Sequence, residues 1–197
     1  MNCTNFLCWN CRGVSNFRTV NRVKKLLNRL NLTFICLVET RADEDRTSRF
    51  CNKFSKRYDW AAIPARGFSG GIIILWRKGF GKITHVAFSR YALHLVITSG
   101  NPREWILSVV YNSQHIYTQH ALWKSLSSIA LLDLPWLIIG DFNAILLVSE
   151  HRGGNSSSYN AKWKLFNEFV SNNFLLDLGF LGPEFTWCNG RGGLARR

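Results

Sequence analysis

The chain of 197 residues has few acidic side chains and no long hydrophobic run. Its 12 Asp and Glu stand against 25 Lys and Arg, which gives a formal net charge of +13. No apolar stretch approaches the ~18–20 residues that a membrane helix needs, and no basic region precedes an apolar one at the N-terminus. The sequence therefore shows neither a transmembrane segment nor a signal peptide. The shortage of acids favours a polyanionic partner, either nucleic acid or an anionic membrane surface.

Disorder and a disulfide framework are also disfavoured. Hydrophobic residues make up 47 % of the chain and aromatic residues 14 %, enough for a packed core in one domain. Without a secretory signal, the six cysteines are expected to be reduced thiols. Cys8 and Cys11 form a C-x-x-C pair, but no second pair of ligands stands at zinc-site spacing. We therefore expect these two thiols to be packing residues.

Apolar runs and helical periodicity alternate along the chain. Val20, Val23, Leu27 and Leu30 recur at helical spacing and predict a helix over Arg18–Leu30. Polar or amphipathic stretches predict further helices at Asp43–Phe54, Thr118–Ala130 and Ala161–Val170. Short β-branched or buried runs predict strands at Phe6–Trp9, Phe34–Val38, Ile72–Trp76, Ile83–Phe88, His94–Thr98, Trp105–Tyr111 and Trp136–Ile139. We expect antiparallel pairing among the four runs between Ile72 and Tyr111. This mixture of elements predicts a layered α/β sandwich.

Polar side chains stand at the ends of four of these strands. Asn10, Glu39 and Tyr111 end or follow three of them, and Asp141 and Asn143 follow the fourth. A polar residue often ends a strand for structural reasons alone, but recurrence at four strand ends favours a shared site. All the candidate donors are oxygens, which suit Mg²⁺ or Mn²⁺ rather than zinc.

The order of the short motifs around these residues resembles the endonuclease/exonuclease/phosphatase superfamily, which includes DNase-I-like nucleases. Within it, the chain most resembles the endonuclease domain of plant LINE-type (non-LTR) retrotransposons. The motifs are Trp9-Asn10-Cys11-Arg12-Gly13, Leu37-Val38-Glu39-Thr40, Ser69-Gly70-Gly71, Val110-Tyr111, Gly140-Asp141-Phe142-Asn143, Glu150-His151-Arg152-Gly153-Gly154 and Phe185-Thr186-Trp187.

The resemblance implies a four-layer α/β sandwich, in which two facing β-sheets are flanked by helices. It also implies metal-dependent phosphodiester hydrolysis by in-line attack of water. Glu39 then corresponds to the main Mg²⁺ (or Mn²⁺) ligand and Asn10 to its helper. Asp141 corresponds to the residue that orients or deprotonates the water, Asn143 to a hydrogen-bond donor to a phosphate oxygen, and Tyr111 to a phenol that contacts the phosphate.

A DNA partner follows from this resemblance and from the positive charge. Arg12, Arg18, Arg22 and Trp187 are the candidate nucleic-acid-binding residues, although a basic helix face is more often merely solvated and Trp187 suits core packing. Nothing in the sequence points to an obligate protein partner. A nuclear location is implied by the resemblance alone.

The chain departs from the superfamily pattern near its C-terminus. The superfamily has a further Asp and a Ser-Asp-His motif there, and none of the five histidines lies in such a motif. We expect residues 1–197 to form one domain that is incomplete at its C-terminus, lacks the last strands of the second sheet and is a poor or inactive nuclease. The alternatives are a non-catalytic nucleic-acid-binding remnant and a phosphatase of the same superfamily.

Overall fold

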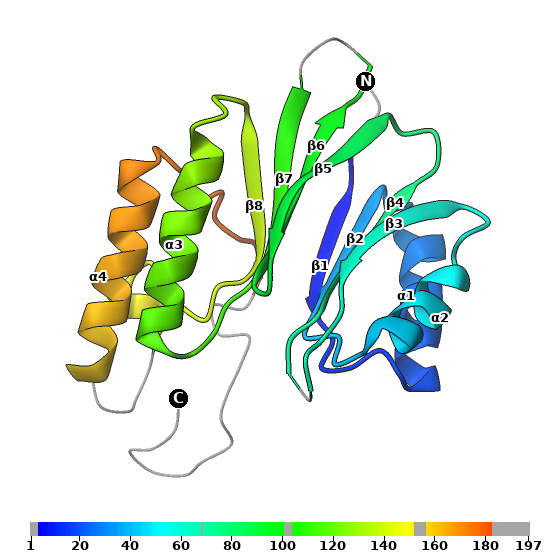
Figure 1. Cartoon of the computed structure of the whole chain (residues 1–197), viewed down its shortest axis with the longest axis horizontal. Coiled ribbons are helices and arrows are strands. Elements are labelled where there is room, and N and C mark those ends of the chain that lie inside the picture. Colours follow the sequence, from blue (N-terminus) through cyan, green and yellow to red (C-terminus); the bar gives the residue numbers. More distant parts are fainter. Residues whose placement is uncertain (1–3, 68, 101–103, 152–156, 183–197) are drawn as a thin grey trace. The chain divides into compact units, whose positions relative to one another are not determined.

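The computed structural model describes residues 4–67, 69–100, 104–151 and 157–182, and the chain divides into two compact units (Figure 1). The first unit comprises Met1–Asn112 and Asp133–Asp141, and the second comprises Ser113–Leu132 and Phe142–Arg197. Within the described residues, no helix is long and apolar enough to cross a membrane.

The first sheet of the first unit has the strand order β1-β2-β4-β3. Its strands are β1 (Phe6–Asn10), β2 (Phe34–Val38), β3 (Tyr58–Ile63) and β4 (Ile72–Arg77). β1 and β2 run parallel, whereas β4 is antiparallel to both β2 and β3. Because β1 and β2 are parallel, the residues at their carboxyl ends reach the same edge of the sheet.

The second sheet belongs to the same unit and has the order β5-β6-β7-β8. Its strands are β5 (Lys82–Ser89), β6 (Ala92–Thr98), β7 (Glu104–Tyr111) and β8 (Trp136–Asp141). The first three are antiparallel neighbours, and β8 runs parallel to β7 with Tyr111 opposite Asp141. The parallel pair therefore brings these two polar residues to one edge.

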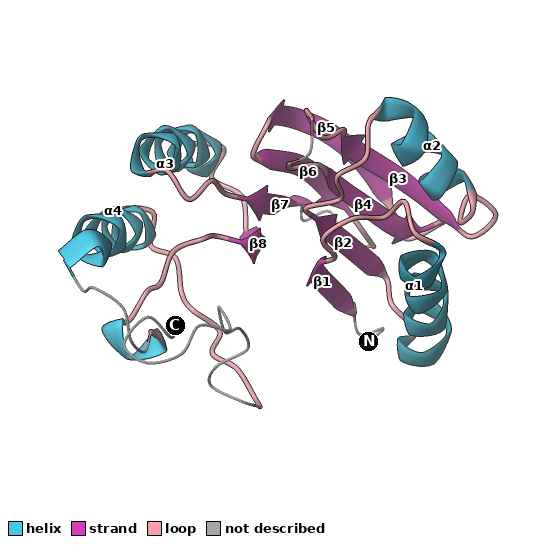
Figure 2. Ribbon diagram, turned by 90° about the horizontal axis from the view of Figure 1, so that it is seen from below, coloured by secondary structure: helices cyan, strands magenta, loops and turns pink. Residues whose placement is uncertain are grey.

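The two sheets pack face to face, which explains the continuous apolar runs of β2 and β4. Successive side chains of a strand point to opposite faces. Phe34, Cys36 and Val38 pack toward the second sheet, in a core that includes Leu93 and Leu107. The alternate residues of β2 face a core formed with helices, as Figure 2 shows for α1 and α2 beside this sheet. Both faces of β2 are thus buried, and the strand has no polar side.

Two helices cover the outer face of the first sheet. Helix α1 (Phe17–Leu30) begins after Asn16, whose side-chain oxygen accepts a hydrogen bond of 2.7 Å from the Thr19 amide. It buries Val20, Val23 and Leu27 of the apolar stripe predicted from the sequence, whereas Leu30, at the end of the helix, is 43 % exposed. Helix α2 (Glu44–Asn52) begins after Asp43, which caps the Arg46 amide in the same way. Both helices thus lie within about one or two residues of the ends predicted from the sequence.

The second unit contains α3 (Ile116–Ala130), the short 3₁₀ helix η1 (Val148–Glu150) and α4 (Ser157–Asn172). α3 and α4 lie side by side in both views (Figures 1 and 2) and share an aromatic cluster. The ring centroids of Trp123 lie 5.0 Å from those of both Phe166 and Phe169. The described part of α4 is longer than the predicted Ala161–Val170 segment.

The sequence pattern was misleading at two points of the first sheet. It did not predict β3, whose sequence Tyr-Asp-Trp-Ala-Ala-Ile carries only a weak alternation of burial. It also grouped Ile72–Trp76 with the three strands that follow, but this run lies in β4 and pairs with β2 and β3 in the other sheet. The local sequence indicates that a strand is buried, but it does not indicate which strand pairs with it.

Candidate active site

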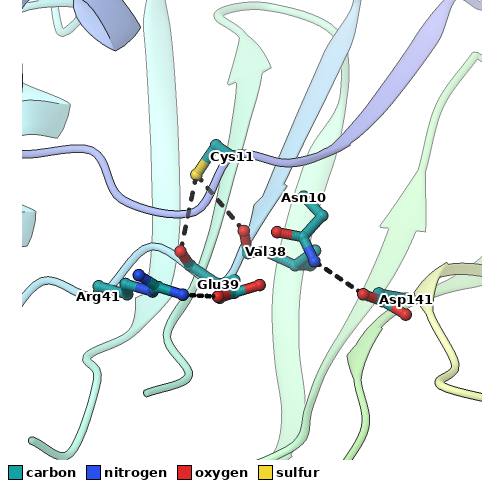
Figure 3. Close-up of polar contacts among 6 residues, drawn as sticks. All are labelled: Asn10, Cys11, Val38, Glu39, Arg41 and Asp141. Atoms are coloured by element: carbon teal, nitrogen blue, oxygen red, sulfur yellow. Dashed lines mark hydrogen bonds and ion pairs between the residues drawn. The ribbon is translucent and has the colours of Figure 1, made fainter. Parts of the chain in front are cut away.

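Four of the predicted site residues lie together in the first unit, where strands of both sheets end. Asn10 is the last residue of β1, Glu39 follows β2, and Tyr111 and Asp141 end β7 and β8. The Asn10 Nδ2 donates a hydrogen bond of 2.7 Å to the Asp141 Oδ2, across a sequence separation of 131 residues (Figure 3). This contact joins the first sheet to the second. We refer to Asn10, Glu39, Tyr111 and Asp141 as the strand-end cluster.

Tyr111 is influenced by both carboxylates of the strand-end cluster. Burial raises the pKa of its phenol, and the negative charges of Glu39 and Asp141 and a hydrogen bond to Glu39 raise it further. The nearby positive charge of Arg41 lowers it, by less than burial or either carboxylate raises it. Because the net shift is upward, the phenol stays protonated at neutral pH and acts as a hydrogen-bond donor.

The loop after β2 holds Glu39 in an unusual backbone conformation. Glu39 has φ +56° and Arg41 has φ +51°, both in the left-handed region that non-glycine residues seldom occupy. The amides of Thr40 and Arg41 donate to the carbonyls of Gly71 (3.2 Å) and Gly70 (3.0 Å). Strain of this kind typically costs ~1–3 kcal/mol for each residue and persists only where surrounding contacts maintain it.

Gly71 has to be glycine for these two backbone hydrogen bonds to form. Its φ is +87°, and a Cβ placed on it would lie 2.1 Å from the Thr40 Oγ1. The Ser69-Gly70-Gly71 motif thus supports the backbone that carries Glu39. The carbonyls of its two glycines supply these contacts.

Arg41 is a residue of this site that the sequence analysis missed. Its Nη2 forms an ion pair with the Glu39 Oε1. The Arg41 side chain is 47 % exposed and that of Glu39 is 11 % exposed, so a partly solvated cation contacts a largely buried carboxylate. The one feature of the sequence that could have pointed to Arg41 is its position, two residues after the candidate metal ligand Glu39.

Gly140 sets the position of Asp141. It has φ +152°, and a Cβ on it would lie 2.0 Å from the Val110 carbonyl oxygen of the neighbouring strand. Beyond it, the Asp141 carbonyl accepts a hydrogen bond of 2.9 Å from the Asn112 amide. The close approach of β8 to β7 therefore requires glycine immediately before the acidic residue.

The two thiols near the cluster are packing residues, as predicted. Cys8 and Cys11 are free, and burial is the largest cause that raises their pKa values to about 12 and about 11. The Cys11 Sγ donates to the Val38 carbonyl oxygen at 3.4 Å. Among the described residues, no third His, Cys, Asp or Glu side chain groups with this C-x-x-C pair in a way that could hold a metal ion.

The remaining predicted catalytic residue, Asn143, belongs to the second unit. It has φ +46°, and its carbonyl accepts a hydrogen bond of 2.9 Å from the Nε2 of Gln119. The same Nε2 donates to the Ser113 carbonyl at 2.9 Å. Gln119 is completely buried and was not recognised in the sequence, where a glutamine on a helix is normally exposed. The side-chain role of Asn143 stays a prediction.

Three of the four predicted nucleic-acid-binding residues are exposed in the first unit. Arg12 follows β1 and has φ +49°, and Arg18 and Arg22 lie on α1. α1 contains five basic residues and no acidic one, and its described side chains form no ion pair. The fourth, Trp187, lies outside the described residues.

The strand-end cluster offers oxygen ligands to a metal ion. The Asn10 Oδ1 is buried and has no hydrogen-bond partner, because the amide nitrogen of the same side chain is the group that contacts Asp141. Glu39 and Asp141 add two carboxylates. In the described part of the chain, no three His, Cys, Asp or Glu side chains group together, so a metal ion held by Glu39 and Asp141 would need amide or water oxygens to complete its coordination. Such a donor set suits Mg²⁺ or Mn²⁺.

Comparison with known proteins assigns the family. Residues 7–197 match the model of the Endonuclease/Exonuclease/phosphatase family, and the chain belongs to this family. A search of the curated proteins finds no match. The structural comparisons agree with the α/β fold of two mixed sheets and flanking helices that the sequence predicts.

Three solved structures illustrate the likeness. The AP endonuclease LMAP from Leishmania major is 13 % identical with a TM-score of 0.65, and the matched region covers 86 % of this chain and 66 % of that one. The APE2 catalytic domain from Xenopus laevis is 18 % identical with a TM-score of 0.60, and 83 % of this chain covers 67 % of it. The 3′ phosphatase NExo from Neisseria, bound to product DNA hairpin, is 12 % identical with a TM-score of 0.62, and 86 % of this chain covers 71 % of it. This chain thus spans roughly two thirds of the length of each.

Proposed function

We propose that this chain is a metal-dependent phosphodiester hydrolase domain of the DNA endonuclease type, and that residues 1–197 by themselves are a poor catalyst. The observation that carries the proposal is the hydrogen bond from the Asn10 amide to the Asp141 carboxylate, which joins the strand ends of the two sheets at the strand-end cluster that also contains Glu39. Two carboxylates ~4 Å apart repel by roughly 4 kcal/mol at an effective dielectric of 20. A cation offsets this cost, and a cluster of this kind is therefore suited to binding one.

Each residue of the cluster has a distinct role in the proposed reaction. Glu39 and the unpartnered Oδ1 of Asn10 would hold Mg²⁺ or Mn²⁺, which when bound polarises a phosphate oxygen and absorbs negative charge. Asp141, oriented by Asn10, accepts a proton from the attacking water. The water oxygen forms the new bond to phosphorus, and the bond to the leaving sugar oxygen breaks without a covalent enzyme intermediate.

Tyr111 and Asn143 act on the phosphate itself. The raised pKa of Tyr111 keeps its hydroxyl proton in place, so the phenol, which donates to Glu39 in the free chain, can donate to a phosphate oxygen instead when substrate binds. We assign the same kind of contact to the Asn143 amide. Fixed donors aimed at developing negative charge commonly contribute 10²–10³ in rate each.

DNA binding is assigned to the basic residues near the start of the chain. No acidic residue precedes Glu39, whereas Arg12, Arg18 and Arg22 are exposed. Arginines on such a surface neutralise backbone phosphates and release counterions. Trp187 is assigned to base stacking by its motif.

The experiment is a single-turnover nicking assay on supercoiled plasmid with the chain in excess and Mg²⁺ present. We expect Glu39→Gln to slow nicking by about 10²–10³ relative to the unsubstituted chain. Glu44→Gln is the matched control, because Glu44 is exposed on α2 and neutralises the same charge elsewhere. Nicking that Glu39→Gln leaves unchanged would overturn the proposal. Salt-sensitive DNA binding without nicking would instead identify a binding remnant, and release of inorganic phosphate would identify a phosphatase.

We further infer an origin in a plant LINE-type retrotransposon and a location in the nucleus. The supporting feature is the motif order that begins at Trp9-Asn10-Cys11-Arg12-Gly13. The genomic neighbourhood tests the origin, since a reverse-transcriptase reading frame is expected beside this one. Imaging of a fluorescent fusion tests the location, and a fusion excluded from the nucleus would contradict it.

A further inference from the structure

In this structure, Glu39 already pairs with a positively charged side chain. The guanidinium of Arg41, two residues further along, pairs with the Glu39 Oε1. In the view of Figure 3 it reaches this carboxylate from the side opposite Asn10 and Asp141. Tyr111 also donates to Glu39, so the carboxylate has two protein partners. A metal ion that uses Glu39 as a ligand must therefore compete with groups of the chain itself.

The loop backbone favours the pair between Arg41 and Glu39. Both residues are in the left-handed region, and the intervening Thr40 is 0 % exposed. The amide of Arg41 is held by the Gly70 carbonyl at 3.0 Å, which limits movement of the loop. The arginine side chain itself is 47 % exposed, so it can leave the carboxylate for water at modest cost.

We propose that Arg41 is a resident counter-cation that competes with the divalent metal for Glu39, so that metal binding and release of the arginine are coupled. The proposal rests on the proposed function, in which Glu39 and Asn10 hold the metal. In the metal-free chain, Arg41 offsets the repulsion between the carboxylates of Glu39 and Asp141. When a dication enters, it takes over this role and repels the guanidinium.

The physical consequence is a lowered metal affinity in the unsubstituted chain. A site in which part of the population is blocked binds with an affinity reduced by that fraction, and a neighbouring positive charge weakens a dication further. Removal of the charge of Arg41 is therefore expected to tighten metal binding by about tenfold, which corresponds to 1.4 kcal/mol.

The test measures Mn²⁺ binding to the full chain directly, through the electron paramagnetic resonance signal of the free ion. Arg41→Gln is expected to bind Mn²⁺ about tenfold more tightly than the unsubstituted chain, and Glu39→Gln is expected to lose binding. Arg46→Gln is the matched control, because Arg46 is exposed on α2 and pairs with Asp43 rather than with the cluster. It removes one positive charge and should leave the affinity unchanged.

A second variant and a second readout keep the test valid if Arg41→Gln folds poorly. Arg41→Lys retains the charge and is expected to bind Mn²⁺ within about threefold of the unsubstituted chain. The rise in melting temperature on adding Mn²⁺ should be larger for Arg41→Gln than for Arg46→Gln, because only the former lacks the internal cation.

The failures of the two proposals are distinguishable. If Glu39→Gln loses Mn²⁺ binding but Arg41→Gln binds no more tightly than Arg46→Gln, the competition is overturned and the metal site stands. An Arg41→Lys chain that binds as tightly as Arg41→Gln also overturns it. If neither the unsubstituted chain nor Arg41→Gln binds Mn²⁺, the metal site of the proposed function is wrong and the competition falls with it.

Discussion

Acidification is expected to destabilise the second sheet through one buried histidine. His94 on β6 is 2 % exposed, and its Nδ1 lies 2.7 Å from the Oγ of Ser108 on β7. The same Oγ accepts a hydrogen bond of 2.7 Å from the Trp136 Nε1 on β8. Since Ser108 already accepts from Trp136, its hydroxyl proton is available to a neutral His94. These three side chains connect the strands that carry Tyr111 and Asp141.

The magnitude follows from the pKa of His94, which burial lowers from 6.5 to about 4. The native state keeps this imidazole neutral, whereas the unfolded chain binds a proton below pH 6.5. The free energy of unfolding therefore falls as the pH drops from 6.5 toward 4 and is unaffected by this group above 6.5. The full loss is about 3 kcal/mol, because each pKa unit is worth about 1.4 kcal/mol.

The perturbation is His94→Asn, which retains an acceptor near the Nδ1 position and does not titrate. Urea unfolding followed by tryptophan fluorescence gives the free energy of unfolding at several pH values between about 7.5 and 4.5. The unsubstituted chain should lose roughly 2–3 kcal/mol more than His94→Asn between these limits. Comparison of the two chains cancels the effect of the other titrating groups.

His85→Asn is the matched control, because His85 lies exposed on the neighbouring strand β5. Its pH dependence should follow that of the unsubstituted chain. Parallel loss of stability in the unsubstituted chain and in His94→Asn would refute the reasoning, since it would show that His94 does not remain neutral in the folded state.

Two further predictions concern backbone packing and charge. Gly140→Ala should lower the free energy of unfolding by roughly 2–4 kcal/mol in urea titrations, because its Cβ would meet the Val110 carbonyl oxygen at 2.0 Å. Gly67→Ala has positive φ but open space and should cost less; an equal loss would contradict the clash. The double substitution Arg18→Gln and Arg22→Gln should reduce the slope of log affinity for DNA against log salt by about 2. A control with Lys53→Gln and Lys56→Gln, two exposed positions, should keep the slope, and an equal loss in both pairs would argue against contact at α1.

Much of the fold was predictable because the burial of a segment determines the pattern of apolar residues within it. The run Phe34–Val38 is apolar throughout because it is covered on both faces, and the spacing of Val20, Val23 and Leu27 reflects one covered face of α1. The strand ends were predictable for the same reason, since each apolar run stops where a polar residue begins. The candidate residues Asn10, Glu39 and Asp141 followed from those ends, and their chemical roles remain predictions.

Other features depend on contacts between distant segments. Only the tertiary structure pairs β4 with β2 and β3, and only it brings Asn10 to Asp141. Arg41 could not be singled out among 25 basic residues, because its partner is set by a left-handed turn that two glycine carbonyls hold in place. The sequence by itself determined which segments are buried and where they end, since hydrophobic burial is encoded residue by residue. The tertiary structure decided which ends meet, because strand pairing and loop conformation depend on the whole unit.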